Sequence, residues 1–515
     1  MGNCIAWAGD GDSSQPGNIG RSKIEMAQSI ESLQPSLVWQ IFAGMAAVPR
    51  PSKQEERIRA HVKQFAESKG LKVREEQIGN LIIDVPATKG HESAPITVLQ
   101  GHLDMVCEKN SGTAHDFDKE GIKLLIDKEP KTGEPIVRAD GTTLGADNGM
   151  GVALALAAAL DPAVVHGPLE ILLTIDEEAG MSGAKALTPQ SFKGRRMINL
   201  DSEEDDAIYI GCAGGCDTNL TWRLGLSAKG ESAESCRVIV EGLRGGHSGG
   251  DIHEGRGNAI KLLGRVLSRI GSDGLRIASI VGGSKRNAIP REAHAELLGP
   301  GGMTAQLQKA ASAIEQEAKA DSFEPQVRIR VEKAEIDKAA SAEQSAALLA
   351  AIAALPSGVL GMHPKVPELV QTSNNVSTIE TKSAGGSIDV VIGCLSRSSS
   401  NSRLDETKRQ LAAIGFLAGA TIEIGNEYPG WEPDLDSPTL AKCKGVYERL
   451  FGHPPKVLAI HAGLECGIIG QRVGKMDMVS FGPHITGAHS PDELVYVNSV
   501  AKSWKYLQAV LAELA

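Results

Sequence analysis

The sequence of 515 residues contains few aromatic residues, no long apolar run and no cluster of basic residues. Aromatic residues make up 3% of the chain. The longest apolar stretch, Met150–Leu160, is far shorter than the roughly 20 residues that span a bilayer. The formal net charge is −11, which argues against a nucleic-acid-binding surface. The sequence therefore disfavours both a membrane-spanning protein and a nucleic-acid-binding protein.

The eight cysteines are dispersed and show no CxxC spacing. This pattern indicates neither a structural zinc site nor a disulfide framework, so we expect a reducing compartment and a cytoplasmic location. The chain is 41% hydrophobic and 23% charged, as in ordinary globular proteins. Its length exceeds what one hydrophobic core usually holds, so two or three domains are expected.

The first 33 residues differ from the rest of the chain. They have neither the basic region nor the apolar region of a secretory signal, and a disordered tail at 1–33 is the simpler interpretation. The start Met1-Gly2-Asn3-Cys4 also resembles an acylation signal, with Gly2 for myristate and Cys4 for palmitate. Ala6 departs from that signal, since Ser or Thr is usual there. Membrane association is expected only if Gly2 and Cys4 are acylated.

Predicted strands and helices alternate after residue 34. The stretches ITVLQ, LEILLTID and RRMINLD predict strands buried on both faces, and DNGMGVALALAAALDP predicts a buried helix. Such alternation favours an α/β fold with a mostly parallel sheet.

The pattern changes near the segment GCAGG at 211–215. From there the predicted strands, such as CRVIVEGL and GSIDVVIGC, are separated by longer amphipathic helices, which favours an α+β layer with one exposed face. After Pro429 the earlier pattern returns. We therefore predict one domain made of residues 34–213 and 429–515, interrupted by an inserted domain at 214–428.

Acidic residues and histidines follow several of the predicted strands. In an open α/β sheet, ligands gather at the carboxyl ends of the strands. Two histidines with several carboxylates suit a pair of divalent metal ions, with zinc first and manganese or cobalt as alternatives. From the spacing alone, a solvated acidic surface remains an alternative. The residues are His102, Asp104, Asp147, Glu177, Glu178, Asp201 and His489.

These residue types match the needs of metal-assisted hydrolysis. Asp147, in the turn GADNG, is short and rigidly held, as a carboxylate that bridges two metal ions must be. Of the neighbours Glu177 and Glu178, one can bind a metal ion while the other takes a proton from water and passes it to a leaving amine. Asp104, two residues after His102, can hold that imidazole in the required tautomer.

Longer motifs resemble those of a known enzyme family. They include GHLDMVCEK, GADNGMGVA, TIDEEAGMSGA, GGHSGGDIHEGRGNAIK, HAGLECGI and GPHITGAHSPDE, in this order. The chain is similar to the aminoacyl-histidine dipeptidases, which cleave Xaa-His dipeptides and belong to the di-zinc aminoacylase and carboxypeptidase superfamily. The similarity extends from about residue 34 to the end, and no site position departs from the family pattern.

The resemblance implies a role for each candidate residue. Asp147 would bridge two metal ions, and the peptide that follows it would be cis. His102 and Asp201 would complete one ion site, and Glu178 and His489 the other. Glu177 would be the general base for a metal-bridging water, and Asp104 would orient His102.

The resemblance also implies residues that contact the substrate. His247, in the GGHSGG turn, would reach over the metal ions to the scissile carbonyl. Asn287 and Arg397 would hold the substrate carboxylate; the alternative for Arg397 is a solvated side chain in a Ser-rich turn. Glu465 would hold a substrate ammonium group, and His461 is either a substrate contact or a structural residue.

The implied function is a metallopeptidase that hydrolyses Xaa-His and related dipeptides, with the inserted domain acting as a lid and forming a homodimer. An enzyme that deacylates N-acyl amino acids would use the same metal ions, but the motif HAGLECG disfavours it. A non-catalytic binding protein should have lost Glu177 or a metal ligand, and each of these positions is occupied.

Overall fold

A computed structural model describes residues 29–270, 274–321, 324–366 and 369–515. Gly2 and Cys4 lie outside these residues, so their acylation stays a prediction. The first described element is the 3-10 helix η1 (Ile30–Ser32), and Leu33, which follows it, is buried in the core. The predicted tail at 1–33 is therefore wrong for residues 30–33, because Leu33 packs with the first helix. No helix among the described residues has the length and hydropathy of a membrane span.

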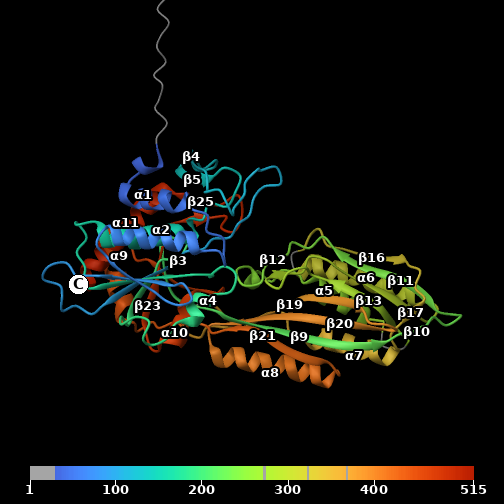
Figure 1. Ribbon diagram of the computed structural model, residues 1–515. Coiled ribbons are helices and arrows are strands. Elements are labelled where there is room, and N and C mark those ends of the chain that lie inside the picture. The colour runs from blue at the N-terminus through green and yellow to red at the C-terminus, as the bar shows by residue number, and fades with distance from the viewer. Residues whose placement is uncertain (1–28, 271–273, 322–323, 367–368) are drawn as a thin grey trace, which may run out of the picture.

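The molecule consists of two bodies, each built around one sheet (Figure 1). The first sheet has eight strands, and four of its seven pairings are parallel, in agreement with the predicted mostly parallel α/β sheet. In spatial order the strands are β1 (Lys72–Glu75), β2 (Leu81–Val85), β6 (Leu169–Thr174), β3 (Thr97–His102), β7 (Arg196–Asn199), β23 (Asp477–Ser480), β8 (Ala207–Cys212) and β22 (Lys456–Ile460).

Helices cover both faces of this first sheet. Ile83 of β2 packs on one side, and its neighbour Ile82 packs on the other, as expected for strands buried on both faces. One side is covered by α1 (Ser36–Ala46), α2 (Glu56–Ser68), α3 (Ala146–Leu160), α9 (Pro438–Phe451) and α11 (Val497–Leu514). The other side is covered by α4 (Ser182–Ala186) and α10 (Glu465–Val473).

A small four-stranded sheet lies beside α1 in the first body (Figure 1). The sequence did not predict this sheet, because its strands are short and β25 pairs with β5 across more than 300 residues of chain. Its order is β24 (Ile485–Thr486), β25 (Leu494–Tyr496), β5 (Pro135–Ala139) and β4 (Leu124–Lys128). The loop between β24 and β25 carries His489.

The second body is a nine-stranded antiparallel sheet with helices packed on one face. Leu220 and Trp222 of β9 are buried against the helices, whereas Arg223, the residue after Trp222, is exposed on the other face. This alternation agrees with the predicted α+β layer with one exposed face. The strands are β16 (Arg328–Lys333), β11 (Glu234–Glu241), β15 (Ala293–Gly299), β13 (Arg276–Gly282), β19 (Val370–Ser383), β20 (Ser387–Ser398), β9 (Gly214–Gly225) and β21 (Thr421–Tyr428), with β18 (Gly358–Met362) on β19.

The remaining elements of the second body are helices and short strand pairs between Gly214 and Tyr428, the range predicted for the insertion. The helices are α5 (Ala259–Ser268), α6 (Met303–Asp321), α7 (Ala342–Ala354), α8 (Asn401–Leu417) and the 3-10 helix η2 (Ile252–Glu254). The short pairs are β10 (Ser227–Ala228) with β17 (Lys338–Ala339), and β12 (Gly246–His247) with β14 (Ala288–Ile289).

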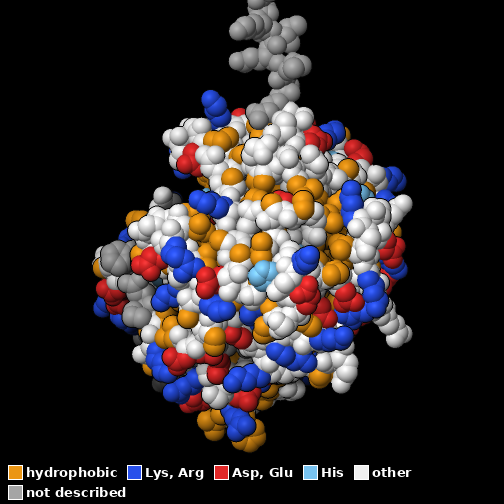
Figure 2. All heavy atoms as spheres, turned by 90° about the vertical axis from the view of Figure 1, so that its left-hand side faces the viewer, with side chains coloured by type: hydrophobic (Ala, Val, Ile, Leu, Met, Phe, Trp, Pro, Cys, Tyr) orange, Lys and Arg blue, Asp and Glu red, His pale blue; other side chains and the backbone are white. Residues whose placement is uncertain are grey.

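The two chain segments that join the bodies run side by side. Cys212 and Trp431 exchange two backbone hydrogen bonds, of 3.0 and 2.9 Å. A side chain at Gly214 would come within 2.3 Å of the Gly430 nitrogen, so this close approach requires glycine. On the face of the first body shown in Figure 2, basic and acidic side chains are interspersed, and no basic surface gathers among the residues drawn in colour.

The position of Leu507 predicts a large effect on stability. Leu507 of α11 is fully buried in the core of the first body, whereas Leu435 in a connecting loop is 44% exposed. We expect Leu507→Ala to lower the free energy of unfolding by about 2–5 kcal/mol, because it leaves a cavity. Leu435→Ala should change it by less than about 0.5 kcal/mol. Urea unfolding followed by circular dichroism measures both, and equal effects would contradict the assigned core.

Candidate metal centre

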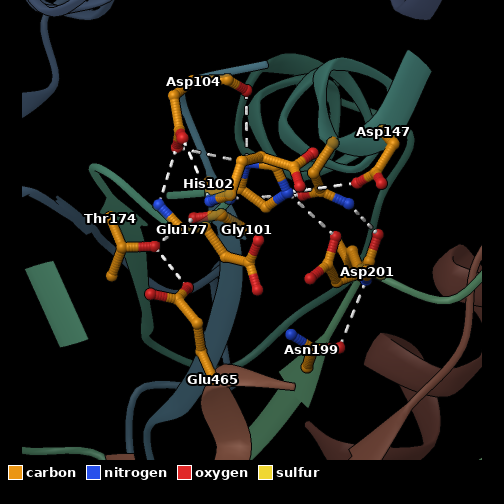
Figure 3. Close-up of polar contacts among 12 residues, drawn as sticks. Gly101, His102, Asp104, Asp147, Thr174, Glu177, Asn199, Asp201 and Glu465 are labelled. Carbon is orange, nitrogen blue, oxygen red and sulfur yellow. Dashed lines mark hydrogen bonds and ion pairs between the residues drawn. The ribbon is translucent and has the colours of Figure 1, made fainter. Parts of the chain in front are cut away.

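The candidate residues converge where three parallel strands end. His102 is the last residue of β3, Glu177 and Glu178 follow β6, and Asp201 follows β7. Because β6, β3 and β7 are parallel neighbours, their carboxyl ends lie side by side. Asp147 enters from the first turn of α3, next to His102 and Asp201 in Figure 3. The peptide Asp147–Asn148 is cis, as the resemblance implied.

The Asp147 carboxylate lies between two imidazoles. Its Oδ1 is 3.1 Å from Nε2 of His102, and its Oδ2 is 3.2 Å from Nε2 of His489. On one side, His102 Nε2 is also 3.3 Å from Asp201 Oδ1. On the other side, His489 Nε2 is 3.0 Å from Glu178 Oε2. Two groups of three donors, His102–Asp147–Asp201 and Asp147–Glu178–His489, therefore share Asp147.

These distances fit two metal ions. Around a tetrahedral zinc with bonds of about 2.0–2.1 Å, neighbouring ligand atoms lie about 3.3 Å apart. Glu178 Oε1 is buried without a hydrogen-bond partner among the described residues, and Asp201 Oδ1 lies 3.3 Å from His102 Nε2 without forming a well-aligned hydrogen bond. Buried carboxylate oxygens that lack donors are expected where cations bind. The mixed imidazole and carboxylate donors suit zinc, manganese or cobalt.

The electrostatics of the site also favour cations. Burial, together with the carboxylates of Asp147 and Glu178, raises the pKa of Asp201 to about 7. Hydrogen bonds to Asp147 and Glu178 raise the pKa of His489 to about 11. Burial makes the largest contribution at Asp201 and the carboxylates make it at His489. The neighbouring carboxylates raise the pKa of both groups, and two divalent ions would neutralise that negative charge.

Asp104 contacts the far side of the His102 ring. Its Oδ1 lies 3.4 Å from His102 Nδ1, and its backbone oxygen lies 3.2 Å from the same nitrogen. Burial opposes the ionisation of Asp104, but hydrogen bonds from His102, Ser52 and the Glu177 amide outweigh it and lower the pKa to about 2. Asp104 is thus where a residue that orients His102 must be.

The Glu177 carboxylate borders a cavity of about 660 Å³ that also contains Glu178 and His489. No hydrogen bond from another described residue reaches this carboxylate, whereas the Glu177 amide is fixed by Asp104 at 3.0 Å. The far wall of the cavity is acidic, formed by residues 203–206. Lys456 forms a salt bridge with Asp206, and Lys502 forms one with Asp205. Among the described residues, Glu203 and Glu204 have no such basic partner.

His247 belongs to the second body and lies within reach of the charges of Arg397 and His489. The ring Nδ1 of His247 accepts the Gly250 amide hydrogen at 2.9 Å. In the neutral ring, the hydrogen is then on Nε2, which becomes a donor. Burial, and then the nearby Arg397, lower the pKa of His247 and favour this neutral form.

Arg397 and His461 lie close to His247 at the junction of the bodies. Arg397 of β20 is buried and donates to the Tyr428 hydroxyl at 3.0 Å. The His461 ring contacts the Ser373 hydroxyl at 2.7 Å, so it joins the first body to β19 of the second. Burial, and then Arg397, lower the pKa of His461 to about 3. Arg397 and His461 are therefore buried and hydrogen-bonded side chains, not solvated ones.

Glu465 and Asn287, two predicted substrate contacts, lie in different surroundings. Glu465 is fully buried, and its Oε2 accepts hydrogen bonds from Gln100 at 2.6 Å and Thr174 at 2.5 Å (Figure 3). Its Oε1 has no hydrogen-bond partner among the described residues, and a contact of Glu465 with a substrate ammonium group stays a prediction. Asn287 is exposed, and its backbone oxygen accepts from the Ser248 amide at 2.8 Å. Its role in substrate binding stays a prediction.

Three residues of the segment RPSKQE support the site without any signal in the sequence. The Arg50 guanidinium donates to the backbone oxygens of Leu103 and Asp104, at 3.1 and 3.2 Å. The Ser52 hydroxyl donates to Asp104 at 2.7 Å, and the buried Glu55 accepts the Asp176 amide at 3.1 Å. These contacts span 52 to 121 residues of chain and leave no local periodicity, so no sequence pattern predicts them.

Comparison with known proteins identifies relatives over nearly the whole chain. Residues 98–513 match the family described as Peptidase family M20/M25/M40. The cytosol non-specific dipeptidase of Escherichia coli (strain K12) is 41% identical over 489 residues, which cover 94% of this chain and 99% of that protein.

Solved structures agree with this relationship. The aminoacylhistidine dipeptidase from Vibrio alginolyticus has a TM-score of 0.85 at 40% identity, covering 94% of this chain and 98% of that one. A tripeptidase from Staphylococcus aureus, at 14% identity, has a TM-score of 0.58 over 94% and 99% of the two chains, and it supports the fold alone.

Proposed function

The chain belongs to peptidase family M20/M25/M40, and on that basis we propose that it is a metal-dependent dipeptidase acting on Xaa-His and related dipeptides. The observation that carries the proposal is the shared carboxylate of Asp147, whose oxygens lie 3.1 and 3.2 Å from the imidazoles of His102 and His489. Glu177 borders the same cavity and forms a third possible donor group with His102 and Glu178. Because this third group lacks the shared Asp147, we assign Glu177 to proton transfer.

Two divalent ions are the proposed cofactors, with zinc first and manganese or cobalt as alternatives. His102, Asp147 and Asp201 would hold one ion, and Asp147, Glu178 and His489 the other. When bound, such ions acidify water and polarise the scissile carbonyl group. Glu177 would accept a proton from the attacking water and deliver it to the leaving amine.

The surroundings of the centre suit the two charged ends of a dipeptide. Arg397 would hold the substrate carboxylate, with Tyr428 fixing the guanidinium. The unpaired acids Glu203 and Glu204 would attract the substrate ammonium group, the role also predicted for Glu465. The Nε2 hydrogen of His247 would stabilise negative charge that develops on the carbonyl oxygen.

The acidic cavity wall also separates the two candidate activities. An N-acyl amino acid has no ammonium group, so Glu203 and Glu204 would face an uncharged acyl chain. A dipeptide instead brings a positive charge to these carboxylates. Burial, and then Asp147, raise the pKa of Glu203 to about 8, and a nearby ammonium group would favour its charged form. The acidic residues of the cavity therefore favour dipeptide hydrolysis over N-deacylation.

A reducing, cytoplasmic environment is proposed for the same enzyme. The seven cysteines of the described residues are all free, and six of them are buried. The relative from Escherichia coli is named as a cytosolic protein.

A homodimer formed through the second body is also proposed. Phe416 and Leu417, at the end of α8, are 77% and 84% exposed, and Ile424 of β21 is 46% exposed. Both elements lie along one margin of the second body in Figure 1, and β21 is an edge strand, paired only with β9. An apolar edge of this kind suits a second copy of the chain.

Glu177→Gln should abolish turnover while two metal ions stay bound. The amide is isosteric with the carboxylate but cannot accept the proton, so kcat should fall by at least about 10²–10⁴-fold. Metal analysis of the purified variant, alongside dipeptide kinetics, measures both quantities. As a control, Glu178→Gln should lose metal, since Glu178 is the assigned ligand. Near-normal turnover by the Glu177 variant would remove it from the role of base.

His247→Ala should lower kcat by about 10²–10³-fold with little change in KM or metal content. The reason is that its Nε2 hydrogen acts on charge that develops in the transition state. The matched control is His253→Ala, since His253 is exposed on the adjacent η2 helix. Steady-state kinetics on a dipeptide measures the effect, and a raised KM with an unchanged kcat would make His247 a ground-state contact instead.

Leu417→Glu should convert a dimer into a monomer, because it places a charge in the proposed apolar interface. Analytical ultracentrifugation of the wild-type and variant chains measures the change. Ile78→Glu, at a 41% exposed position of the first body, serves as the control and should stay dimeric. A monomeric wild-type protein would contradict the proposed interface.

A further inference from the structure

Glu493 accepts hydrogen bonds from four successive backbone amides at the start of α3. Its Oε2 accepts from Leu144 at 2.7 Å and Gly145 at 2.9 Å. Its Oε1 accepts from Ala146 at 2.8 Å and Asp147 at 3.3 Å. The residue is only 2% exposed, so water does not compete for these amides.

The amides at the start of a helix have no partner within the helix, and here they are buried. A single carboxylate satisfies them, and it lies at the helix end where negative charge is favourable. The last of these amides belongs to Asp147 itself. The direction in which the Asp147 side chain leaves the backbone is therefore tied to the position of Glu493.

Arg50 holds the same turn from the other side. Its Nη2 donates to the Gly145 oxygen, and its Nη1 donates to the oxygens of Leu103 and Asp104. A side chain at Gly145 would come within 2.5 Å of Nη2, so the turn and the guanidinium are closely packed. Through Arg50, the turn that carries Asp147 is joined to the end of β3, which carries His102.

Glu493 also links this turn to the second imidazole. It lies four residues after His489, in the loop between β24 and β25. The hydrogen bonds of Glu493 therefore fix the His489 loop against the Asp147 turn. The carboxylate belongs to none of the three groups of possible metal donors found among the described residues.

We propose that Glu493 is a positioning residue that sets the Asp147 carboxylate between the two ion sites. It acts through Asp147 and the His489 loop, while Arg50 aligns the turn with His102. The inference rests on the proposed two-metal function and adds a determinant of metal affinity outside the ligands. Because Asp147 is shared, a change at Glu493 must weaken both ion sites together.

The test is zinc binding by the full-length protein, measured by competition with a chelator of known affinity. Wild-type protein is expected to bind two zinc ions. Glu493→Gln should bind both about 10–100-fold more weakly, the usual effect of losing a residue that supports metal ligands. Glutamine keeps one acceptor oxygen, and its NH₂ group would face two N–H donors.

Two further variants separate positioning from charge. Glu493→Asp keeps the charge but is one methylene shorter, so it cannot reach all four amides and should also bind zinc weakly. Asp492→Asn removes a charge from the neighbouring exposed position and should bind zinc like the wild type. Thermal unfolding of the metal-free proteins tests whether each variant remains folded.

The outcomes are distinct. Failure of the wild-type protein to bind zinc would overturn the proposed function itself. Two zinc ions bound equally well by wild type and Glu493→Gln would overturn the positioning role alone. Wild-type affinity in Glu493→Asp would show that charge, not hydrogen bonding, is what Glu493 supplies, and that variant decides the question if Glu493→Gln does not fold.

Discussion

Repulsion among buried carboxylates is the constraint on which the rest of the first body depends. Asp147, Glu178 and Asp201 lie within hydrogen-bond distance of only two imidazoles. Two unit charges 4 Å apart interact by about 4 kcal/mol at an effective dielectric constant of about 20, so several like charges cannot be held together without compensation. Where the protein supplies donors, as for Asp104 and Glu493, the carboxylates are fully hydrogen-bonded. Glu178 and Asp201 each have a buried oxygen without a hydrogen bond, and bound cations would balance the negative charge there.

The two bodies supply different parts of the proposed chemistry. The first holds the donor atoms on the ends of β3, β6 and β7, where the sheet fixes their spacing. The second carries His247 and Arg397, which we propose to contact the substrate, and the two joining segments are paired at Cys212 and Trp431. His461, hydrogen-bonded to Ser373, is a contact between the bodies next to the cavity. A substrate held there would touch both, so its binding is coupled to their relative position.

The residues at strand ends were predictable from the sequence because a buried strand is visible as an apolar run. The polar residue that follows such a run is placed at the carboxyl end of the strand, where ligands bind. The pattern thus located His102, Glu177 and Asp201, while the individual roles came from the family resemblance. Glu493 and Arg50 were not predictable, since their partners lie 346 to 349 and 53 to 95 residues away and leave no periodicity. The role of Glu465 was predicted from the family resemblance alone. The structure adds that Glu465 begins α10 and accepts hydrogen bonds from Gln100 and Thr174, contacts across 365 and 291 residues that no local pattern predicts.

The central claim is that Asp147 joins two metal ions, and anomalous X-ray scattering at the zinc absorption edge tests it most directly. If Asp147 is shared by two metal ions, crystals of the zinc-loaded protein should show two anomalous peaks, both in contact with Asp147. One peak should also contact His102 and Asp201, and the other Glu178 and His489. A single peak at saturating zinc, or two peaks of which one lies away from Asp147, would contradict a shared role for Asp147.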